Sequence, residues 1–197
     1  MEIRTFLNFL GVAEKLKCNT RHSYTSSGRH ESVAEHSWRL ALMAYLVKDE
    51  LPGVDIDRVI RMCLFHDMGE AVTGDIPAFE KTERDEDVEQ TAVSEILKRL
   101  PEPYCMELGE LFREMEALRT PEARLYKALD KLEALIQHNE ADLSTWLPLE
   151  HELQMIYGTE ECGFNEYIKK LRDTVREDSR RKIGKEYKEI PGGQEGA

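Results

Sequence analysis

Residues 63–70 read Cys-Leu-Phe-His-Asp-Met-Gly-Glu, so a histidine and an aspartate directly follow the apolar end of a predicted helix. Because Leu64 and Phe65 precede the pair, we expect His66 and Asp67 to be buried. A buried carboxylate needs a cation or several hydrogen bonds to offset the loss of water. The stretch therefore indicates a metal ion, and the alternative is an ordinary surface pair that caps the helix end.

A second candidate ligand lies upstream, on a helix whose start is marked by a capping box. Ser32 and Glu35 have the spacing for reciprocal hydrogen bonds to free backbone N–H groups, which predicts a helix over about residues 33–48. His36 lies one turn into this helix, on its apolar face. It is either a ligand or a core histidine bonded to the backbone. Imidazole and carboxylate together suit manganese, iron, cobalt, nickel or zinc.

Helical spacing of apolar residues predominates along the chain, and we find no internal repeat, linker or alternating strand. Thr120 and Pro121 mark a strong helix start, and leucines follow on one face as far as about Glu140. We expect an all-α single domain over residues 1–187 and a disordered tail over residues 188–197. Further predicted elements are a helix capped by Asp55 or Asp57 that ends near Gly69, a turn over 73–77, and helices over 81–100, 107–118 and 160–185.

Composition limits the classes of partner. Hydrophobic residues make up 41% and charged residues 34% of the chain, which allows a packed core under charged helix faces. The 27 basic and 39 acidic residues give a net charge of -12, which disfavours a nucleic acid polymer as partner. Residues 15–39 hold five basic and two acidic residues, and this local balance of +3 favours a small anionic ligand.

The chain shows no sign of secretion or of a membrane span. Its four cysteines form no C-x-x-C pair, so we expect reduced thiols in a cytoplasmic protein. The longest apolar run, residues 40–47, has eight residues, and a membrane helix needs about 20. The start of the chain carries an early glutamate, Glu2, and polar interruptions at Asn8 and Glu14, unlike a signal peptide.

Three separated motifs make the sequence recognisable. They are Glu31-Ser-Val-Ala-Glu-His-Ser37, His66-Asp-Met-Gly-Glu-Ala-Val-Thr-Gly-Asp-Ile-Pro77 and Tyr126-Lys-Ala-Leu-Asp-Lys131. Their order along the chain is a first histidine, then the His-Asp pair, and then a distant aspartate. This pattern resembles the HD-domain metal-dependent phosphohydrolases, in the branch of bacterial 5'-deoxynucleotidases. The resemblance covers about residues 5–142.

The resemblance implies a helical HD fold that holds one divalent metal ion, which would be Mn, Co, Fe, Zn, Ni or Mg. The implied ligands are His36, His66, Asp67 and Asp130. Periodicity alone would place Asp130 in solvent, because it lies about 130° from the centre of the leucine stripe of its helix. The sequence between Asp67 and Asp130 contains no histidine, so the site resembles a mononuclear one and a cyclic-nucleotide phosphodiesterase is disfavoured.

The resemblance also implies residues that contact the substrate. Arg21 matches an arginine that orients the phosphate, and the next residue, His22, stands where many relatives have a tryptophan. Glu70 and Asp75 are the candidates for handling the proton, and the choice between them stays open. The implied substrate-contacting set is Arg21, His22, His36, Asp67, Asp75, Ile76, Pro77 and Ala78.

The resulting hypothesis is a metal-dependent phosphomonoesterase that hydrolyses (deoxy)nucleoside 5'-monophosphates to nucleoside and phosphate. We expect a small-molecule nucleotide substrate, no membrane partner and a homodimer. Two alternatives remain from the sequence. One is another HD-domain reaction, on a nucleoside di- or triphosphate or an oxidation, and the other is a non-catalytic HD-fold binding protein.

Overall fold

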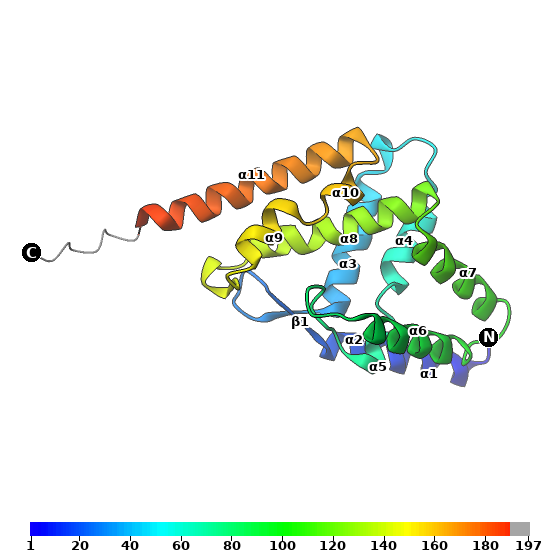
Figure 1. The fold of residues 1–197 in the computed structure, drawn as a ribbon. Helices are drawn as coiled ribbons and strands as arrows, with labels where there is room; N and C mark the ends of the chain where they lie inside the picture. The colour runs from blue at the N-terminus through cyan, green and yellow to red at the C-terminus, as the bar shows by residue number, and fades with distance from the viewer. Residues whose placement is uncertain (190–197) are drawn as a thin grey trace, which may run out of the picture.

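The computed structural model describes residues 1–189, with side chains as far as residue 185. Of the tail predicted for residues 188–197, all but the first two residues lie outside the described part. Helices α3 and α4 lie side by side and both pack against α8, which is drawn across the middle of Figure 1. The elements are α1 (Ile3–Ala13), α2 (Lys15–Cys18), β1 (Thr20–Tyr24), β2 (His30–Ser32), α3 (Val33–Leu46), η1 (Lys48–Glu50), α4 (Ile56–Phe65), α5 (Glu70–Thr73), α6 (Glu83–Leu97), α7 (Tyr104–Ala117), α8 (Pro121–Glu140), η2 (Leu143–Thr145), α9 (Glu150–Ile156), α10 (Thr159–Cys162) and α11 (Glu166–Glu189).

The main core forms where α3, α4 and α8 meet. Leu40 of α3, Met62 of α4, and Leu125, Leu129 and Leu132 of α8 are completely buried. Burial of each such side chain contributes about 1.5–3 kcal/mol. The leucine stripe predicted from the sequence is therefore the buried face of the central helix, and the predicted all-α class is confirmed.

Both predicted helix starts are present. Ser32 Oγ accepts a hydrogen bond from the backbone N–H of Glu35 at 3.2 Å, and Glu35 Oε2 accepts one from the N–H of Ser32 at 2.9 Å. Thr120 Oγ1 accepts from the N–H of Ala123 at 3.2 Å, and Pro121 occupies the first turn of α8. These caps fix where α3 and α8 begin, and so fix which residues face the core.

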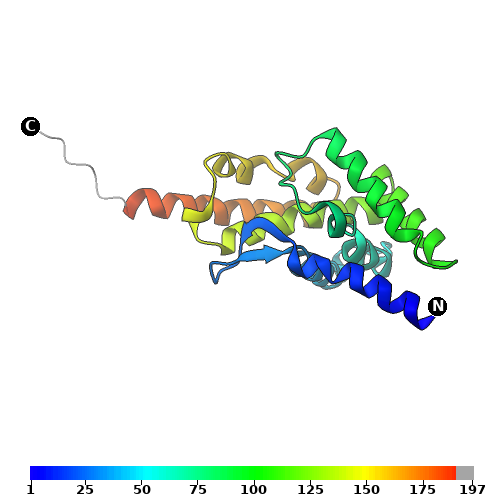
Figure 2. The same cartoon turned by 90° about the horizontal axis from the view of Figure 1, so that it is seen from below.

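A short antiparallel hairpin of β1 and β2 corrects the expectation that the chain has no strand. Its turn includes Gly28 at a φ of 81°, a value that only glycine adopts without strain. The backbone oxygen of Tyr24 accepts a hydrogen bond from Gln137 Nε2 of α8 at 2.6 Å. Figure 2 shows the hairpin beside α8, so the segment that carries Arg21 and His22 is held against the core.

Helix α4 ends at Phe65, earlier than the predicted end near Gly69, and a separate short helix, α5, follows. The break lies at the predicted metal-binding pair, His66 and Asp67, so neither residue is part of a regular helix. Gly69 then packs against α6, where a Cβ atom would lie 3.1 Å from both the backbone oxygen of Glu89 and Cγ2 of Val93. A glycine is therefore needed for α5 and α6 to approach this closely.

Other departures concern amphipathic faces and the C-terminal third. The helix predicted over 160–185 is two helices, because Asn165 Oδ1 caps a new start by accepting the N–H groups of Tyr167 and Ile168. Helices α1, α2 and α9 were not predicted. The apolar side chains of Val88, on α6, and Leu64, on α4, are 51% and 47% exposed, although the spacing of apolar residues along these helices predicts that both face a core. None of the helices within residues 1–189 combines the length and apolar character needed to cross a membrane.

Candidate metal centre

The four implied ligands come from two helices and from the turn after a third, and they converge on one point. His36 lies on α3, His66 and Asp67 follow α4 directly, and Asp130 lies on α8. His36 Nε2 is 3.2 Å from Asp130 Oδ1. His66 Nε2 is 3.0 Å from Asp67 Oδ2 and 3.8 Å from Asp130 Oδ1. Two imidazoles and two carboxylates therefore face a common centre, as donors to one cation do.

The hydrogen bonds at this centre fit a metal ion. His66 Nδ1 donates to the backbone oxygen of Cys63 at 2.9 Å, which leaves the Nε2 lone pair directed at the centre. Within the described residues, His66 Nε2 and Asp67 Oδ2 are buried and have no hydrogen-bond partner. Such unpaired buried groups are costly, and a shared cation would satisfy both at once. The donor set suits a borderline divalent metal.

A buried carboxylate, Glu133, orients His36 from behind. Glu133 Oε2 accepts from His36 Nδ1, and its Oε1 accepts from Arg39 Nε at 2.6 Å. Burial and Arg21 oppose the charge on His36, but Glu133 and Asp130 raise its pKa to about 9. This histidine–carboxylate pair is the arrangement that fixes the ring and raises the basicity of metal-binding histidines.

Lys127 is a further cation at the centre. Its Nζ lies 2.9 Å from Asp130 Oδ2, the carboxylate oxygen that does not face His36. Burial opposes the charge of Asp130, but Lys127 and His36 hold the pKa of this carboxyl well below its usual range. Burial likewise opposes ionisation of Asp67, while His66 lowers its pKa to about 2. Both carboxylates are therefore charged at neutral pH.

Arg21 projects from β1 toward the same centre. Its Nη1 is 3.9 Å from Asp67 Oδ2, and its Nε is 3.4 Å from Glu31 Oε2. Burial opposes its charge, but Glu133, Asp67 and Asp75 raise the pKa of the guanidinium above its ordinary value. The structure thus brings a permanent cation beside the predicted metal ligands, as the sequence implies.

Glu70 and Asp75 contribute two more carboxyl groups. The Glu70 side chain is buried, and its Oε2 has no hydrogen-bond partner within the described residues. Burial, together with the charges of Asp67 and Asp75, raises the pKa of Glu70 to about 10. Burial also raises the pKa of Asp75. A nearby positive charge would favour the ionised form of both.

The remaining predicted substrate residues are not among the four ligands. Ile76 and Pro77 are half-buried in the loop after α5, and Ala78 is exposed. His22 does not join the four ligands; its Nε2 lies 2.7 Å from Glu150 Oε1. The structure therefore brings Arg21, Glu70 and Asp75 together with the metal ligands and places His22 in a separate cluster.

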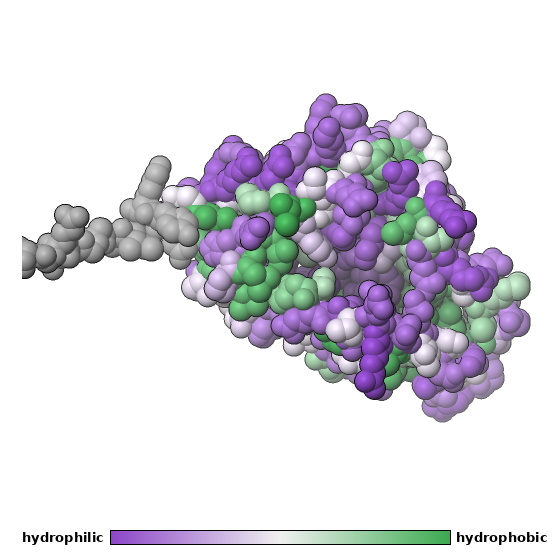
Figure 3. All heavy atoms as spheres, in the orientation of Figure 1, coloured by the Kyte–Doolittle hydropathy of each residue, from purple (hydrophilic) through white to green (hydrophobic). Residues whose placement is uncertain are grey.

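A cavity of about 890 Å³ opens between α6, α7 and α8. Of the predicted site residues it reaches only His66, and its lining includes Tyr126, Lys127 and Lys81. The surface in Figure 3 is mostly hydrophilic and is hollowed near its middle. His66 and Lys127 line this cavity, whereas Arg21 does not.

Comparison with known proteins agrees with this geometry. The family model described as HD domain matches residues 13–172. The chain belongs to the HD-domain family. It is 36% identical to human 5'-deoxynucleotidase HDDC2 over 173 residues, which are 82% of this chain and 79% of the human protein. It is 32% identical over 156 residues to 5'-deoxynucleotidase hdd1 of Schizosaccharomyces pombe, covering 70% of this chain and 78% of that protein.

A solved structure is consistent with the same assignment. The predicted metal-dependent phosphohydrolase of Magnetospirillum magnetotacticum MS-1 superposes with a TM-score of 0.77 at 28% identity, covering 92% of this chain and 96% of that one. The resemblance to HD-domain phosphohydrolases, and within them to 5'-deoxynucleotidases, is confirmed. HD phosphohydrolases depend on a metal, and this chain has donors for one.

Sequence reasoning missed several charged residues of this HD-domain site. Glu133 and Lys127 each lie three residues from Asp130 and so share its helix face, a signal that was available once Asp130 was selected. Glu31 opens the first motif and is almost completely buried beside Arg21. Nothing local in the sequence indicates that Arg39 would reach Glu133, 94 residues away.

We expect Glu133→Gln to weaken metal binding by about 10–100-fold, because the amide cannot hold His36 with a negative charge. The matched control is Glu140→Gln, since Glu140 also binds Arg39, at 2.5 Å, but lies away from His36 on the exposed end of α8. Titration of each variant with Mn²⁺ against a competing chelator measures the difference. Equal affinities for the two variants would show that Glu133 does not support the metal centre.

Proposed function

We propose that this HD-domain protein is a metal-dependent phosphomonoesterase that converts (deoxy)nucleoside 5'-monophosphates to nucleoside and phosphate. The observation that carries the proposal is the position of the Arg21 guanidinium, 3.9 Å from Asp67, beside a converging set of metal ligands. A permanent cation beside a metal centre suits a phosphoryl group. Relatives named 5'-deoxynucleotidase, matched over most of their length, support the nucleotide as substrate.

His36, His66, Asp67 and Asp130 would hold one divalent ion at this centre, and Mn, Co, Fe, Zn, Ni and Mg are the candidates. When bound, such an ion makes a water molecule more acidic and draws electron density from a phosphoryl oxygen. We propose that His36 and Asp67 also contact the phosphate. Glu133 and Cys63 keep the two imidazoles oriented, through the Nδ1 atoms of His36 and His66.

Arg21 binds and orients the phosphate. Its planar guanidinium offers a fork of N–H groups that can hold two phosphoryl oxygens at once, whereas a lysine ammonium is a point charge. Burial beside Glu31 restricts the conformations of the Arg21 side chain. Such a fixed cation is useful because the uncatalysed hydrolysis of a phosphate monoester is extremely slow and needs large electrostatic stabilisation. The charge of Arg21 also offsets the repulsion of an anionic substrate by a chain with a net charge of -12.

Glu70 or Asp75 handles the proton of the attacking water. Glu70 is buried with an unpartnered Oε2, so it has a free acceptor position. Asp75 lies in the loop after α5 together with Ile76, Pro77 and Ala78, and we propose that this loop contacts the sugar. Packing against the sugar edge would favour 2'-deoxy over ribo substrates by a modest factor. His22 would contact the base or sugar where many relatives have a tryptophan.

The test is a screen of ribo- and deoxynucleoside 5'-monophosphates with Mn²⁺, Co²⁺ or Mg²⁺, with phosphate and nucleoside both measured. We expect one phosphate and one intact nucleoside per turnover. His66→Ala is the matched inactive control, because it removes a metal ligand. Cleavage of nucleoside di- or triphosphates with no release from monophosphates would assign another HD-domain reaction. Binding without turnover for every metal would leave a non-catalytic binding protein.

A second prediction concerns Arg21. If this side chain stabilises the transition state, Arg21→Ala and Arg21→Lys both lose kcat, by about 10²–10³ for alanine, with metal content unchanged. The matched control is Arg29→Ala, since Arg29 lies in the same hairpin but is 58% exposed and pairs with Glu35. Steady-state kinetics at saturating nucleotide measure the effect. A metal-loaded Arg21→Ala protein with an unchanged kcat would show that Arg21 has no such role.

We further infer that residues 1–187 form one domain that pairs with a second copy in the cytoplasm. The central helix α8 packs against both α3 and α11, so elements from the N-terminal and C-terminal halves of the chain share one core. All four cysteines are free thiols, as a reducing compartment allows. One face of α3 is apolar yet exposed, as the pairing surface of a homodimer would be in a free protomer. It consists of Trp38, Leu42, Tyr45 and Leu46, between 42% and 67% exposed.

We expect sedimentation to give the mass of a dimer, and Leu46→Glu to shift it to that of a monomer, because a buried charge opposes pairing. Val88→Glu is the control, since Val88 is similarly exposed on a different helix, α6. A monomeric unaltered protein would contradict the inference.

A further inference from the structure

Three side chains outside the candidate metal centre form a second compact cluster. His22 comes from β1, His138 from the last turn of α8 and Glu150 from the first turn of α9. Glu150 Oε1 lies 2.7 Å from His22 Nε2 and 2.9 Å from His138 Nε2. One atom from each residue therefore faces the other two, and all three lie within 4.8 Å of one another.

The hydrogen bonds of His138 leave its Nε2 atom facing the carboxylate oxygen Oε1 of Glu150. Its Nδ1 lies 2.9 Å from the backbone oxygen of Ala134, which can only accept, so Nδ1 carries a hydrogen. In the neutral ring the Nε2 lone pair then faces the lone pairs of Glu150 Oε1. His66 shows the same arrangement at the first centre, with Nδ1 on a backbone oxygen and Nε2 beside Asp67.

The carboxylate of Glu150 is fixed in the orientation that a ligand requires. Its Oε2 accepts the backbone N–H of Leu147 at 2.7 Å, which leaves Oε1 to face the two imidazoles. The side chain is only 5% exposed. Burial opposes its ionisation, but the neighbouring imidazoles of His138 and His22 hold the pKa of this carboxyl well below its usual range. The negative charge is thus present and almost removed from water.

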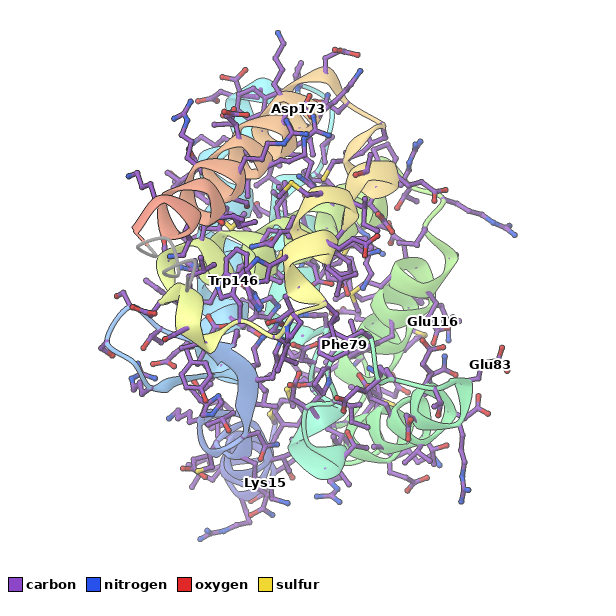
Figure 4. The ribbon with its side chains drawn as sticks, turned by 60° about the vertical axis from the view of Figure 1, so that its left-hand side comes forward. Lys15, Phe79, Glu83, Glu116, Trp146 and Asp173 are labelled. Atoms are coloured by element: carbon purple, nitrogen blue, oxygen red, sulfur yellow. The ribbon has the colours of Figure 1, made fainter. Side chains whose placement is uncertain are left out.

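Aromatic neighbours hold the two imidazoles. The His22 ring packs edge-on against Phe79, with centroids 5.4 Å apart, and the His138 ring packs against Trp146 at 5.8 Å. Trp146 Nε1 also donates to the backbone oxygen of His138 at 3.0 Å. Figure 4 labels Phe79 and Trp146, which come from different loops. Rings fixed in this way lose little freedom when they bind a ligand, which favours a preformed site.

We propose that His22, His138 and Glu150 form a second divalent-cation site, for a zinc-class ion held by two imidazoles and one carboxylate. Nitrogen donors favour zinc, cobalt or nickel over magnesium and calcium. A bound ion would join β1 to α8 and α9, which lie far apart from it in the sequence. Because His22 directly follows Arg21, the ion would also fix the strand that carries the guanidinium. The four ligands of the first centre are not part of this site.

The test uses an untagged full-length chain with His66→Ala, a change that removes a ligand only from the first centre. After dialysis against Zn²⁺, this protein is expected to retain one zinc per chain at the second site. Adding His138→Ala or Glu150→Gln should reduce the zinc content at least tenfold. Adding His151→Ala should not, although this ring also packs on Trp146, with centroids 5.6 Å apart. Circular dichroism checks that each variant is folded.

Equal zinc content with and without His138→Ala would overturn the proposal, since His138 and Glu150 would then be a hydrogen-bonded pair that holds no metal. A second measurement is independent of any variant that fails to fold. Zn²⁺ should raise the Tm of the His66→Ala protein, and an unchanged Tm would contradict the site. Because both readouts are binding and stability, they are unaffected if the phosphatase activity proposed for the first centre is wrong.

Discussion

The structure depends on a set of charges buried where α3, α4 and α8 meet. Asp67 and Asp130 bring two negative charges to this point, and the imidazoles of His36 and His66 face them with nitrogen donors. A buried carboxylate without a partner would neutralise or destabilise the fold. The helices can pack here because each of these groups faces a partner of opposite charge or points to the centre that the other donors share.

Several features of the fold follow from that constraint. Helix α4 ends at Phe65, so the His-Asp pair leaves regular helix as it reaches the centre. Gly69 allows α5 to pack tightly on α6, which brings Glu70 to the same region. The hairpin supplies Arg21, whose Nη1 lies 3.9 Å from Asp67 Oδ2. A core of apolar side chains alone would need neither the early end of α4, nor Gly69, nor the hairpin. Each of these three features places one or more polar groups near the two carboxylates.

The sequence predicts well those features that local spacing determines. The structure confirms the predicted caps at Ser32 and Thr120 and the predicted leucine stripe of α8. These predictions succeed because a helix start and an apolar stripe are local patterns. Asp130 was found only through the family resemblance. Its side of α8 is a second buried face, with Tyr126 only 7% exposed, and a single stripe does not reveal such a face.

Tertiary contacts explain the rest. The three-residue strand β2 has too little length to show alternation, and a hydrogen bond from Gln137, 113 residues from Tyr24, holds the hairpin. The cluster of His22, His138 and Glu150 likewise joins three elements that no motif connects.

The most direct test of the whole account is an anomalous difference map from crystals grown with Mn²⁺. We predict a peak among His36 Nε2, His66 Nε2 and the carboxylates of Asp67 and Asp130. Catalytically active, manganese-containing crystals without a peak at that point would contradict it.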